Sequence, residues 1–383
     1  MGLKRKHKLK LLFEAIVSKL VLQLKCFINL LVFWLLKGFL HQQTNKSSNS
    51  ILFINSEKMG DIIVCLDFFY SFQKNNDYNK KIILVSEEYL PLLRLFNLDY
   101  EILTYNKREY KYNFVYRFNT LKKLIALGLK TVVNITPERG SLNDEMTIIS
   151  SANKTIGLKS NSPFLTRTVI NIYNKFYSHF TNSKSNNIYS IMCELNRYFG
   201  LDTKTFSFLP RDDEESKFDG LKGYILIAPS SSEVFRNWDK YKFRELAKRL
   251  SLETKVVVIG TKRQEEVVDF IIDGNTNAIK SIDLNYNELI NLMYNCKLFI
   301  GLDSGLSHLA LQLNKPTLAI IGGGKIGTFF PYKQNSKNKF LFSEMDCFGC
   351  SWMCKYKTPY CISNITVEEV YCASVDILRR DEI

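Results

Sequence analysis

The sequence predicts an α/β protein with two Rossmann-like parallel-sheet domains that face a central cleft, preceded by a basic apolar helix. Short apolar runs alternate with helical patterns along residues 51–135 and again along residues 224–321. Because strands that alternate with helices form parallel sheets with crossovers, each series predicts one domain. The 383 residues suffice for two cores, and a composition of 46% hydrophobic and 23% charged residues is globular.

Residues 1–40 combine positive charge with large apolar side chains. They hold eight lysine and arginine residues against one glutamate, which is half of the net charge of +14. The longest stretch without charge, Cys26–Leu36, is shorter than the roughly 20 apolar residues of a membrane span. Lys19 and Lys25 interrupt any signal-peptide core. A packing helix, an interfacial helix and a tilted span remain open, and the basic residues beside leucine and aromatic residues favour an interfacial helix on an anionic membrane.

The first domain is expected to begin after a polar linker, His41–Ser50. Its apolar strand Ile51–Ile54 leads through a short polar loop into an apolar helix, Ile62–Phe72. The other elements expected in this domain are the strands Ile82–Val85 and Thr131–Ile135 and the helices Tyr89–Phe96 and Thr120–Leu129.

The second domain is expected after the charged, glycine-containing stretch Arg211–Gly223, with the join near residues 205–222. Its expected strands are Tyr224–Ala228, Lys255–Ile259, Leu298–Ile300 and Thr317–Ile321, and its expected helices are Tyr241–Leu250, Gln264–Ile272 and Tyr286–Tyr294. The resulting segments are a helix and linker at 1–48, the two domains at 49–210 and 211–345, and a cysteine-rich end at 346–383. Ligands bind beyond the carboxyl ends of strands in such sheets, so the cleft between the domains is the expected site.

The first loop with candidate chemistry follows the strand Ile51–Ile54 and contains Lys58, Gly60 and Asp61. Gly60 permits close approach of another backbone, and Asp61 stands at the start of a helix. A helix N-cap is the simpler interpretation of Asp61. The functional interpretation is a general base that removes a proton from an attacking hydroxyl.

The second loop follows the strand Tyr224–Ala228 and offers three serines, Ser230, Ser231 and Ser232, followed by Arg236. Serine hydroxyls and backbone N–H groups are hydrogen-bond donors, and the planar fork of arginine suits phosphate. The alternative is a solvated surface loop.

The third loop runs from Gly301 to His308, where a buried strand ends and a helix begins. A strand, a turn of small residues and a helix together aim backbone N–H groups at an anion. Asp303, Ser304, Gly305 and His308 are therefore candidate ligand-binding residues, against the alternative of an ordinary helix cap with a solvated histidine. The later run Gly322–Gly327 is similar to a phosphate-binding loop but lacks the terminal Gly-Lys-Ser/Thr, and a flexible turn is its alternative.

Nine cysteines are unevenly distributed along the chain. Four of them form a tight cluster with the spacing Cys-x₂-Cys-x₃-Cys-x₆-Cys, which suits Zn²⁺ or an iron–sulfur centre but matches no standard zinc finger. A structural metal and reduced packing cysteines both remain open, with disulfides third, because a reducing compartment is expected. The cluster consists of Cys347, Cys350, Cys354 and Cys361; the cysteines expected as buried thiols are Cys26, Cys65, Cys193 and Cys296.

Together, the three loops resemble glycosyltransferase family 9, the group that includes the lipopolysaccharide heptosyltransferases. The resemblance covers most of residues 51–371 and rests on Met59-Gly60-Asp61, on Ala228-Pro229-Ser230 through Arg236-Asn237-Trp238, and on Asp303 through His308. It implies the GT-B architecture and inverting transfer from a nucleotide sugar without a catalytic metal. By resemblance Asp61 is the base, Lys58 and Gly60 lie on the acceptor side, and the second and third loops bind the donor.

Two departures from the family pattern bear on the substrate. The family commonly has lysine where this chain has Arg236, which keeps the charge but changes its geometry. A Gly-Pro-Thr-like turn is usual where this chain has Gly322–Lys325, and the cysteine cluster is not general in the heptosyltransferases. ADP-heptose is therefore one candidate donor.

We predict an inverting, metal-independent glycosyltransferase that moves heptose or a related sugar to a lipopolysaccharide-core or other cell-surface glycan acceptor. Catalysis is expected to need no cofactor, and the cysteine cluster is a candidate site for structural zinc or another metal. Residues 1–40 are expected to bind an anionic membrane surface, which predicts a cytoplasmic protein, peripheral on the inner face of the cytoplasmic membrane. The alternatives are a GT-B sugar-nucleotide epimerase or hydrolase and a basic nucleic-acid-binding protein, although no nucleic-acid partner is expected.

Overall fold

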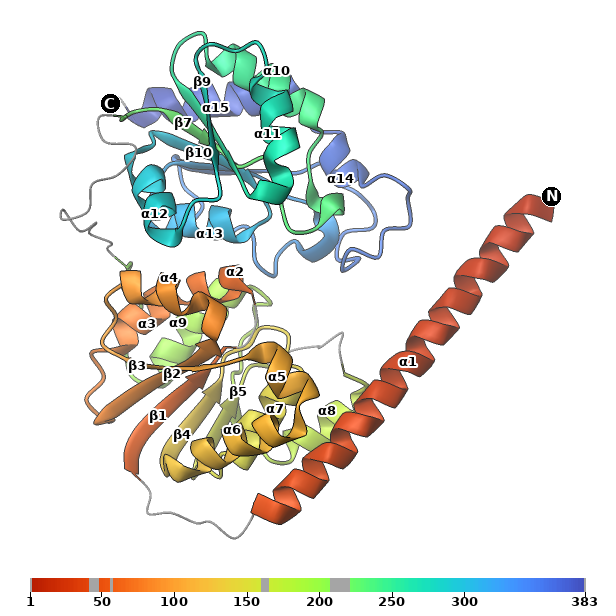
Figure 1. The fold of residues 1–383 in the computed structure, drawn as a ribbon, viewed down its shortest axis with the longest axis vertical. Helices are drawn as coiled ribbons and strands as arrows, with labels where there is room; N and C mark the ends of the chain where they lie inside the picture. Colours follow the sequence, from red (N-terminus) through yellow and green to blue (C-terminus); the bar gives the residue numbers. More distant parts are fainter. Residues whose placement is uncertain (1, 41–47, 56–57, 160–164, 207–220, 382–383) are drawn as a thin grey trace. The chain divides into compact units, whose positions relative to one another are not determined.

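The computed structural model describes residues 2–40, 48–55, 58–159, 165–206 and 221–381 (Figure 1). Packing divides the chain into two compact units. Unit 1 consists of Met1–Glu57, Gln73–Leu90 and Leu98–Ser183; unit 2 consists of Lys58–Phe72, Pro91–Asn97 and Lys184–Ile383. The expected linker and the expected join between domains fall largely outside the described residues, and the domain bounds given above stay predictions.

Unit 1 is built on a six-stranded sheet in which every neighbouring pair of strands is parallel. The strands lie in the order β3-β2-β1-β4-β5-β6. Their bounds are β1 Ser48–Ile54, β2 Lys80–Ser86, β3 Glu101–Tyr105, β4 Leu129–Asn134, β5 Lys154–Gly157 and β6 His179–Phe180.

The sheet of unit 2 is also six-stranded and parallel throughout, in the order β12-β11-β10-β7-β8-β9. Its strands are β7 Ile225–Ile227, β8 Val256–Gly260, β9 Ala278–Ile282, β10 Leu298–Leu302, β11 Thr317–Ile320 and β12 Asn338–Leu341. Numbered within its own unit, each sheet has the order 3-2-1-4-5-6, which is that of the Rossmann fold. The predicted fold class of two Rossmann-like parallel-sheet domains is therefore confirmed.

Helices connect the strands in both units. In the first half of the chain they are α1 Gly2–Leu40, α2 Met59–Ile63, α3 Leu66–Phe72, α4 Leu90–Leu95, α5 Lys107–Tyr112, α6 Phe114–Ala126, α7 Ser141–Ile149 and α8 Arg167–Asn174. In the second half they are α9 Ile188–Tyr198, α10 Lys240–Leu250, α11 Glu265–Ile272, α12 Tyr286–Asn295, α13 Gly305–Gln312, α14 Tyr360–Ser363 and α15 Val367–Asp381.

Two of the expected helices differ from the structure. The apolar run Ile62–Phe72 was expected to be one helix, but a turn at Val64 and Cys65 divides it into α2 and α3. The expected helix Thr120–Leu129 is instead α6, which ends at Ala126 because Gly128 adopts a φ of 56° and terminates it.

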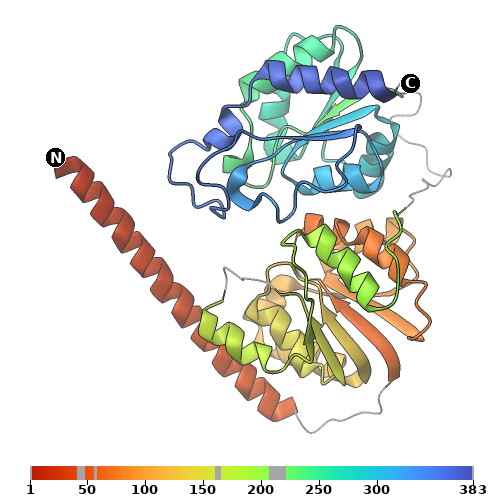
Figure 2. The ribbon, with the colours of Figure 1, turned by 180° about the vertical axis from the view of Figure 1, so that it is seen from behind.

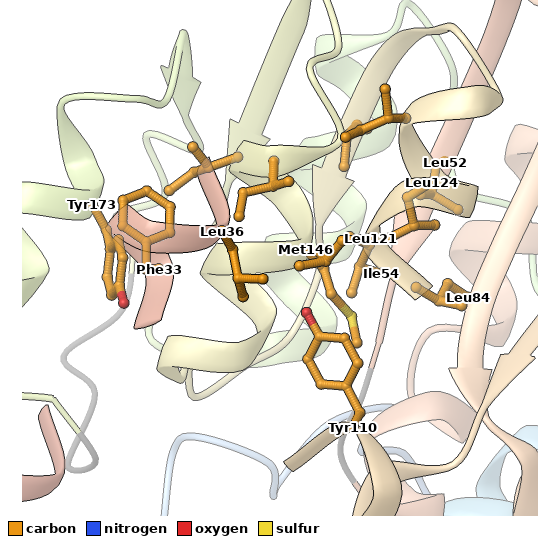
Figure 3. Close-up of a cluster of buried hydrophobic side chains, with 14 of the residues drawn as sticks. Phe33, Leu36, Leu52, Ile54, Leu84, Tyr110, Leu121, Leu124, Met146 and Tyr173 are labelled. Carbon is orange, nitrogen blue, oxygen red and sulfur yellow. The ribbon is translucent and has the colours of Figure 1, made fainter. Parts of the chain in front are cut away.

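Helix α1 packs along unit 1 with one of its sides (Figures 1 and 2). Phe33, Leu36 and Leu40 are buried in the same hydrophobic cluster as side chains of α7 and α8. The ring of Phe33 lies 5.2 Å from that of Tyr173 in an edge-to-face arrangement (Figure 3). The second half of α1 is thus part of the unit 1 core.

The other side of α1 carries a row of exposed apolar side chains at helical spacing. They include Leu20, Leu24, Phe27, Leu31, Trp34, Leu35 and Phe39, each about half exposed or more. By length and composition alone, Val17–Leu40 could cross a membrane, although the sequence shows only a short stretch without charge. The predicted basic apolar helix is present.

A buried ion pair explains why α2 and α3 pack with unit 2. The carboxylate of Asp67 in α3 lies 2.8 Å from Nζ of Lys333, and it also accepts hydrogen bonds from Tyr189 Oη and Phe206 N, each at 2.8 Å. Asp67 is 1% exposed, so these donors replace the water that its charge would otherwise require. The segment Lys58–Phe72 is therefore fixed to unit 2.

Candidate functional site

Three loops of unit 2 leave adjacent strands at the same edge of the sheet. Strands β7, β10 and β11 are neighbours, and the strand order reverses between β7 and β10. Hydrogen bonds continue past the strand ends: Ala228 N donates to Ile300 O at 2.9 Å, and Asp303 N donates to Ile320 O at 3.1 Å. The carboxyl edge at such a reversal is where open α/β sheets bind ligands.

The loop after β7 is shaped by one of its three serines. Ser231 N donates to Asn237 Oδ1 at 2.8 Å, and Ser231 Oγ lies 2.7 Å from the carbonyl oxygen of Glu233. Ser231 is therefore used within the loop, while Ser230 is half-buried and Ser232 is exposed. The sequence did not distinguish these three roles.

Two unpartnered donors lie on the loops after β7 and β10. Among the described residues, neither Nε of Arg236 nor Oγ of Ser304 has a hydrogen-bond partner, although both atoms are buried. Ser304 occupies the N-cap position of α13, yet its side chain makes no capping hydrogen bond. The side chain of Ser304 therefore does not act as an ordinary helix cap. Buried donors without partners are rare in folded proteins, and a ligand oxygen would satisfy them.

Asp303 lies next to two of the cations of this edge. The residue is 9% exposed, and this burial raises the pKa of its carboxyl group, while the nearby charges of Arg236 and Lys325 act in the opposite direction. The three charged groups therefore come from the three loops after β7, β10 and β11 and lie close together. The arrangement holds net positive charge beside the start of α13, which suits an anionic ligand.

A contact between two glycines joins α2 to α13. A Cβ atom on Gly305 would lie 2.6 Å from Cε of Met59 and 3.3 Å from Gly60 N, and one on Gly60 would lie 3.0 Å from Cδ2 of His308. Two backbones can approach this closely only because neither residue has a side chain. The sequence pattern marks both glycines but does not place them against one another.

Asp61 follows directly, at the third position of α2. One of its carboxylate oxygens accepts a hydrogen bond from Lys58 N at 3.0 Å, which closes the first turn of the helix, and the side chain is half-buried. Asp61 is therefore not the N-cap itself, a position that Lys58 occupies. Nζ of Lys58 lies 3.2 Å from Glu233 Oε1 on the loop after β7.

His308 lies beneath this contact, inside a stack of aromatic rings. Its ring is stacked on Phe330 with the centroids 4.2 Å apart, and its Nδ1 lies 2.9 Å from Tyr332 Oη. Burial lowers the pKa of His308 to about 3, so the ring is neutral near pH 7. The structure thus places His308 where it supports Gly60, and sequence could not foresee the burial because both stacking rings come from a later loop.

The comparisons with known proteins point to one family. Residues 194–354 match the model described as glycosyltransferase family 9 (heptosyltransferase). This match covers less than half of the chain, which over these residues is similar to glycosyltransferase family 9. Over 120 residues it is 26% identical to lipopolysaccharide heptosyltransferase 3 of Escherichia coli, covering 30% of this chain and 35% of that protein. Over 157 residues it is 25% identical to lipooligosaccharide heptosyltransferase 2 of Campylobacter jejuni, covering 39% and 48%. The chain thus spans between a third and a half of these curated relatives.

Solved structures of bacterial glycosyltransferases have a similar fold. A family 9 glycosyltransferase from Veillonella parvula superposes with a TM-score of 0.70 at 17% identity, covering 88% of this chain and all of that one. The E. coli heptosyltransferase WaaC, solved with ADP-2-deoxy-2-fluoro heptose, gives 0.64 at 13% identity, covering 85% and 99%. The iron-containing dodecameric glycosyltransferase TibC of E. coli gives 0.51 at 16% identity, covering 89% and 78%.

The four clustered cysteines line a single small pocket of about 60 Å³. Burial raises the pKa of the Cys361 thiol, and the neighbouring thiols of Cys347, Cys354 and Cys350 act in the same direction. The donor atoms are of the type that soft metals prefer. Nevertheless, no three His, Cys, Asp or Glu side chains among the described residues stand close enough together to hold a metal ion.

The other cysteines were expected to be buried thiols. Cys26, Cys65 and Cys296 are buried as expected, whereas Cys193 is only half-buried, which corrects that part of the prediction. Cys193 lies on α9. Its thiol is beside the polar groups of Tyr189, Thr203 and Asp67, so its surroundings are not the apolar ones that the sequence suggested.

Trp352 is the residue that sequence reasoning missed. The indole ring lies 5.0 Å from the guanidinium carbon of Arg236, and its Nε1 is buried without a partner among the described residues. Aromatic side chains inside the cysteine cluster, at Phe348 and Trp352, were the available signal. The spacing of the cysteines alone assigns no role to these two rings.

We predict that His308 makes the protein less stable in acid. The unfolded chain protonates this histidine near pH 6.5, whereas the folded ring stays neutral down to about pH 3. Between these values the unfolded state binds more protons, so the contribution of His308 to stability is complete above pH 6.5 and falls as the pH drops, by up to about 1.4 kcal/mol per pH unit. Urea unfolding of the wild type and His308→Asn from pH 7 to pH 4 should give a shallower slope for the variant. Equal slopes would contradict the buried, neutral ring.

Proposed function

We propose that this chain is an inverting, metal-independent glycosyltransferase. It transfers heptose or a related sugar from a nucleoside-diphosphate sugar to a lipopolysaccharide-core or other cell-surface glycan acceptor. Supporting this proposal are the family model and the relatives named as heptosyltransferases, which the chain matches over part of their length. The fold of WaaC, solved with a fluorinated ADP-heptose, points the same way.

The observation that carries the proposal is the pair of unpartnered donors, Arg236 Nε and Ser304 Oγ, at the reversal of the unit 2 sheet. In transfer from a nucleotide sugar, negative charge builds up on the departing diphosphate. Preorganised donors and positive charge at that place lower the barrier. The positive charge comes from Arg236 and Lys325, and hydrogen-bond donors come from Arg236 and the first N–H groups of α13. Ser230 and Ser232 are further donors on the loop after β7. Charge stabilisation of this kind takes the role that a metal ion has in other transferases.

Asp61 is the proposed general base. An inverting reaction needs a carboxylate that removes the proton of the acceptor hydroxyl while that oxygen attacks the sugar carbon on the face opposite to the diphosphate. Asp61 is half-buried and held by Lys58 N, and the contact between Gly60 and Gly305 fixes its helix against the start of α13. The acceptor side would then include Lys58 and Gly60.

The Asp61→Asn variant tests this assignment. Asparagine keeps the side-chain size and the acceptor for Lys58 N but cannot take a proton, so we expect turnover to fall by at least about 100-fold. Stabilisation by ADP in a thermal-shift assay should not change. The exposed Asp273→Asn is the matched control and should turn over normally. Full turnover in Asp61→Asn would refute the base; nucleotide-sugar hydrolysis or epimerisation without a glycosylated product would instead favour the alternative enzyme class.

We also propose that α1 binds the protein to the inner face of the cytoplasmic membrane as an interfacial helix. The side opposite the exposed apolar row is buried in the unit 1 core from Cys26 to Leu40, so lipid cannot surround that half of the helix. An apolar row flanked by Lys19 and Lys25 suits the boundary between anionic headgroups and acyl chains. The segment Val17–Leu40 is long enough to span, and the experiment separates the two modes.

Vesicle binding of Phe27→Glu/Leu31→Glu tests the interfacial helix. The wild type should sediment with vesicles that contain phosphatidylglycerol and be released by alkaline carbonate. The double variant places two charges in the exposed row and should bind at least about tenfold more weakly. Tyr241→Glu, at an exposed aromatic position of unit 2, is the control. Resistance of the wild type to carbonate would identify a span instead.

For the cysteine cluster we propose a structural metal that does not contact the reacting groups. Four thiols facing one pocket are a soft-metal donor set, and TibC, which shares the fold, is described as iron-containing. Because the described thiols stand too far apart to coordinate an ion as they are, binding would draw the loop that carries Cys347, Cys350 and Cys354 toward Cys361.

Metal analysis of protein purified without oxygen tests this proposal. We expect about one zinc or iron ion per chain, lost in Cys350→Ser/Cys354→Ser and retained in Cys372→Ser, an exposed cysteine outside the cluster. Metal-free protein whose four cluster thiols all react with a thiol reagent would instead identify reduced packing cysteines.

A further inference from the structure

The glycine run after β11 is a seat for two aromatic side chains. The ring of Trp352 occupies the places where Cβ atoms of Gly322 and Gly324 would lie, and the ring of Phe348 occupies that of Gly323. Gly324 lies outside the left-handed region, so its backbone conformation does not require glycine. Glycine is required there because the indole ring fills the space that a side chain would need. Gly322–Gly324 is therefore packed against two rings. The sequence alone left a phosphate-binding loop and a flexible turn as the two interpretations of this run.

Backbone hydrogen bonds join the same two segments. Gly349 N donates to Gly323 O at 2.8 Å, and Ser351 N donates to Gly324 O at 2.8 Å. The loop of residues 346–354, which carries three of the four clustered cysteines, is therefore attached to the glycine run by both ring packing and main-chain bonds. A shift of one segment has to move the other.

The ring of Trp352 also contacts the loop after β7. The guanidinium carbon of Arg236 lies 5.0 Å from the indole centroid, and the ring of Phe235 lies 5.5 Å from it. A cation held over an indole face is attracted by the ring and loses freedom to turn. Trp352 thus orients Arg236 on the loop after β7 and packs on the glycine run next to Lys325 on the loop after β11. These are two of the three loops at the proposed donor site.

We propose that Trp352 is a positioning residue of the donor site, through which the cysteine loop controls donor affinity. Trp352 acts on the donor through Arg236 and Gly322–Gly324, and it stands between Cys350 and Cys354 in the chain. Whatever holds these thiols together therefore holds the indole in place. The inference rests on the proposed function, because it names what regulates that same site.

The first experiment measures nucleotide binding with ADP, GDP and UDP as probes, by thermal shift and then by calorimetry with the probe that binds. Trp352→Ala should raise the dissociation constant about tenfold, which corresponds to about 1.4 kcal/mol. Trp352→Phe retains a ring over the glycines and should stay within about threefold of the wild type. Met353→Ala is the matched control, since Met353 is the exposed neighbour on the same loop.

A second experiment approaches the contact from the opposite side and stays informative if Trp352→Ala folds poorly. Gly324→Ala places a Cβ against the indole and should weaken binding as Trp352→Ala does. In Gly324→Ala/Trp352→Ala the space left by the indole accepts the new methyl group, so the double variant should bind no more weakly than Trp352→Ala. Strictly additive losses would overturn the proposal, because they would show that the two residues act independently.

A third arm tests the link to the cysteines. Cys350→Ser/Cys354→Ser should weaken nucleotide binding by a factor similar to that of Trp352→Ala, while Cys372→Ser should not. Equal binding by the wild type and Trp352→Ala would overturn the inference alone. Loss of binding in Trp352→Phe as large as in Trp352→Ala would also overturn it, because the indole N–H would then be a direct ligand contact. If the wild type bound none of the three nucleotides, this result would count against the proposed function itself.

Discussion

The parallel direction of the strands is the constraint on which the candidate site depends. In a parallel sheet every strand ends at the same edge, so loops that are far apart in sequence meet there. β7, β10 and β11 are neighbours in unit 2, and hydrogen bonds from Ala228 and Asp303 to the adjacent strands extend this order into the loops. Arg236, Ser304 and Lys325 are brought together by sheet topology, and no local pattern of their own would do so.

The central strands could be predicted from the sequence, whereas the outer ones could not. β1, β7, β8, β10 and β11 are buried on both faces and read as continuous apolar runs. β3, β9 and β12 are partly exposed and show mixed patterns that resemble loops. The break between α2 and α3 carried no signal either, because the sequence there contains no glycine or proline and stays apolar throughout.

The site divides along a similar line. Motif residues such as Gly60, Asp61 and Arg236 were visible because their spacing matched a known family. Their partners were not, because each depends on contact between distant segments. His308 is buried by rings from a later loop, Gly60 and Gly305 leave room for one another, and Trp352 lies on the glycine run. The sequence therefore reveals residues whose type the chemistry requires. It does not reveal residues whose type is required by packing between distant segments.

The packing of Lys58–Phe72 with unit 2 limits how the molecule can be taken apart. This segment lies between β1 and β2 in the chain, so the chain passes from one unit to the other several times before residue 184. A fragment that starts at Lys184 would lack Asp67, and the largely buried Lys333 would then have no carboxylate partner. Cleavage of a single peptide bond would nick the protein without freeing either unit, and the two cannot be exchanged between relatives as blocks joined at one point.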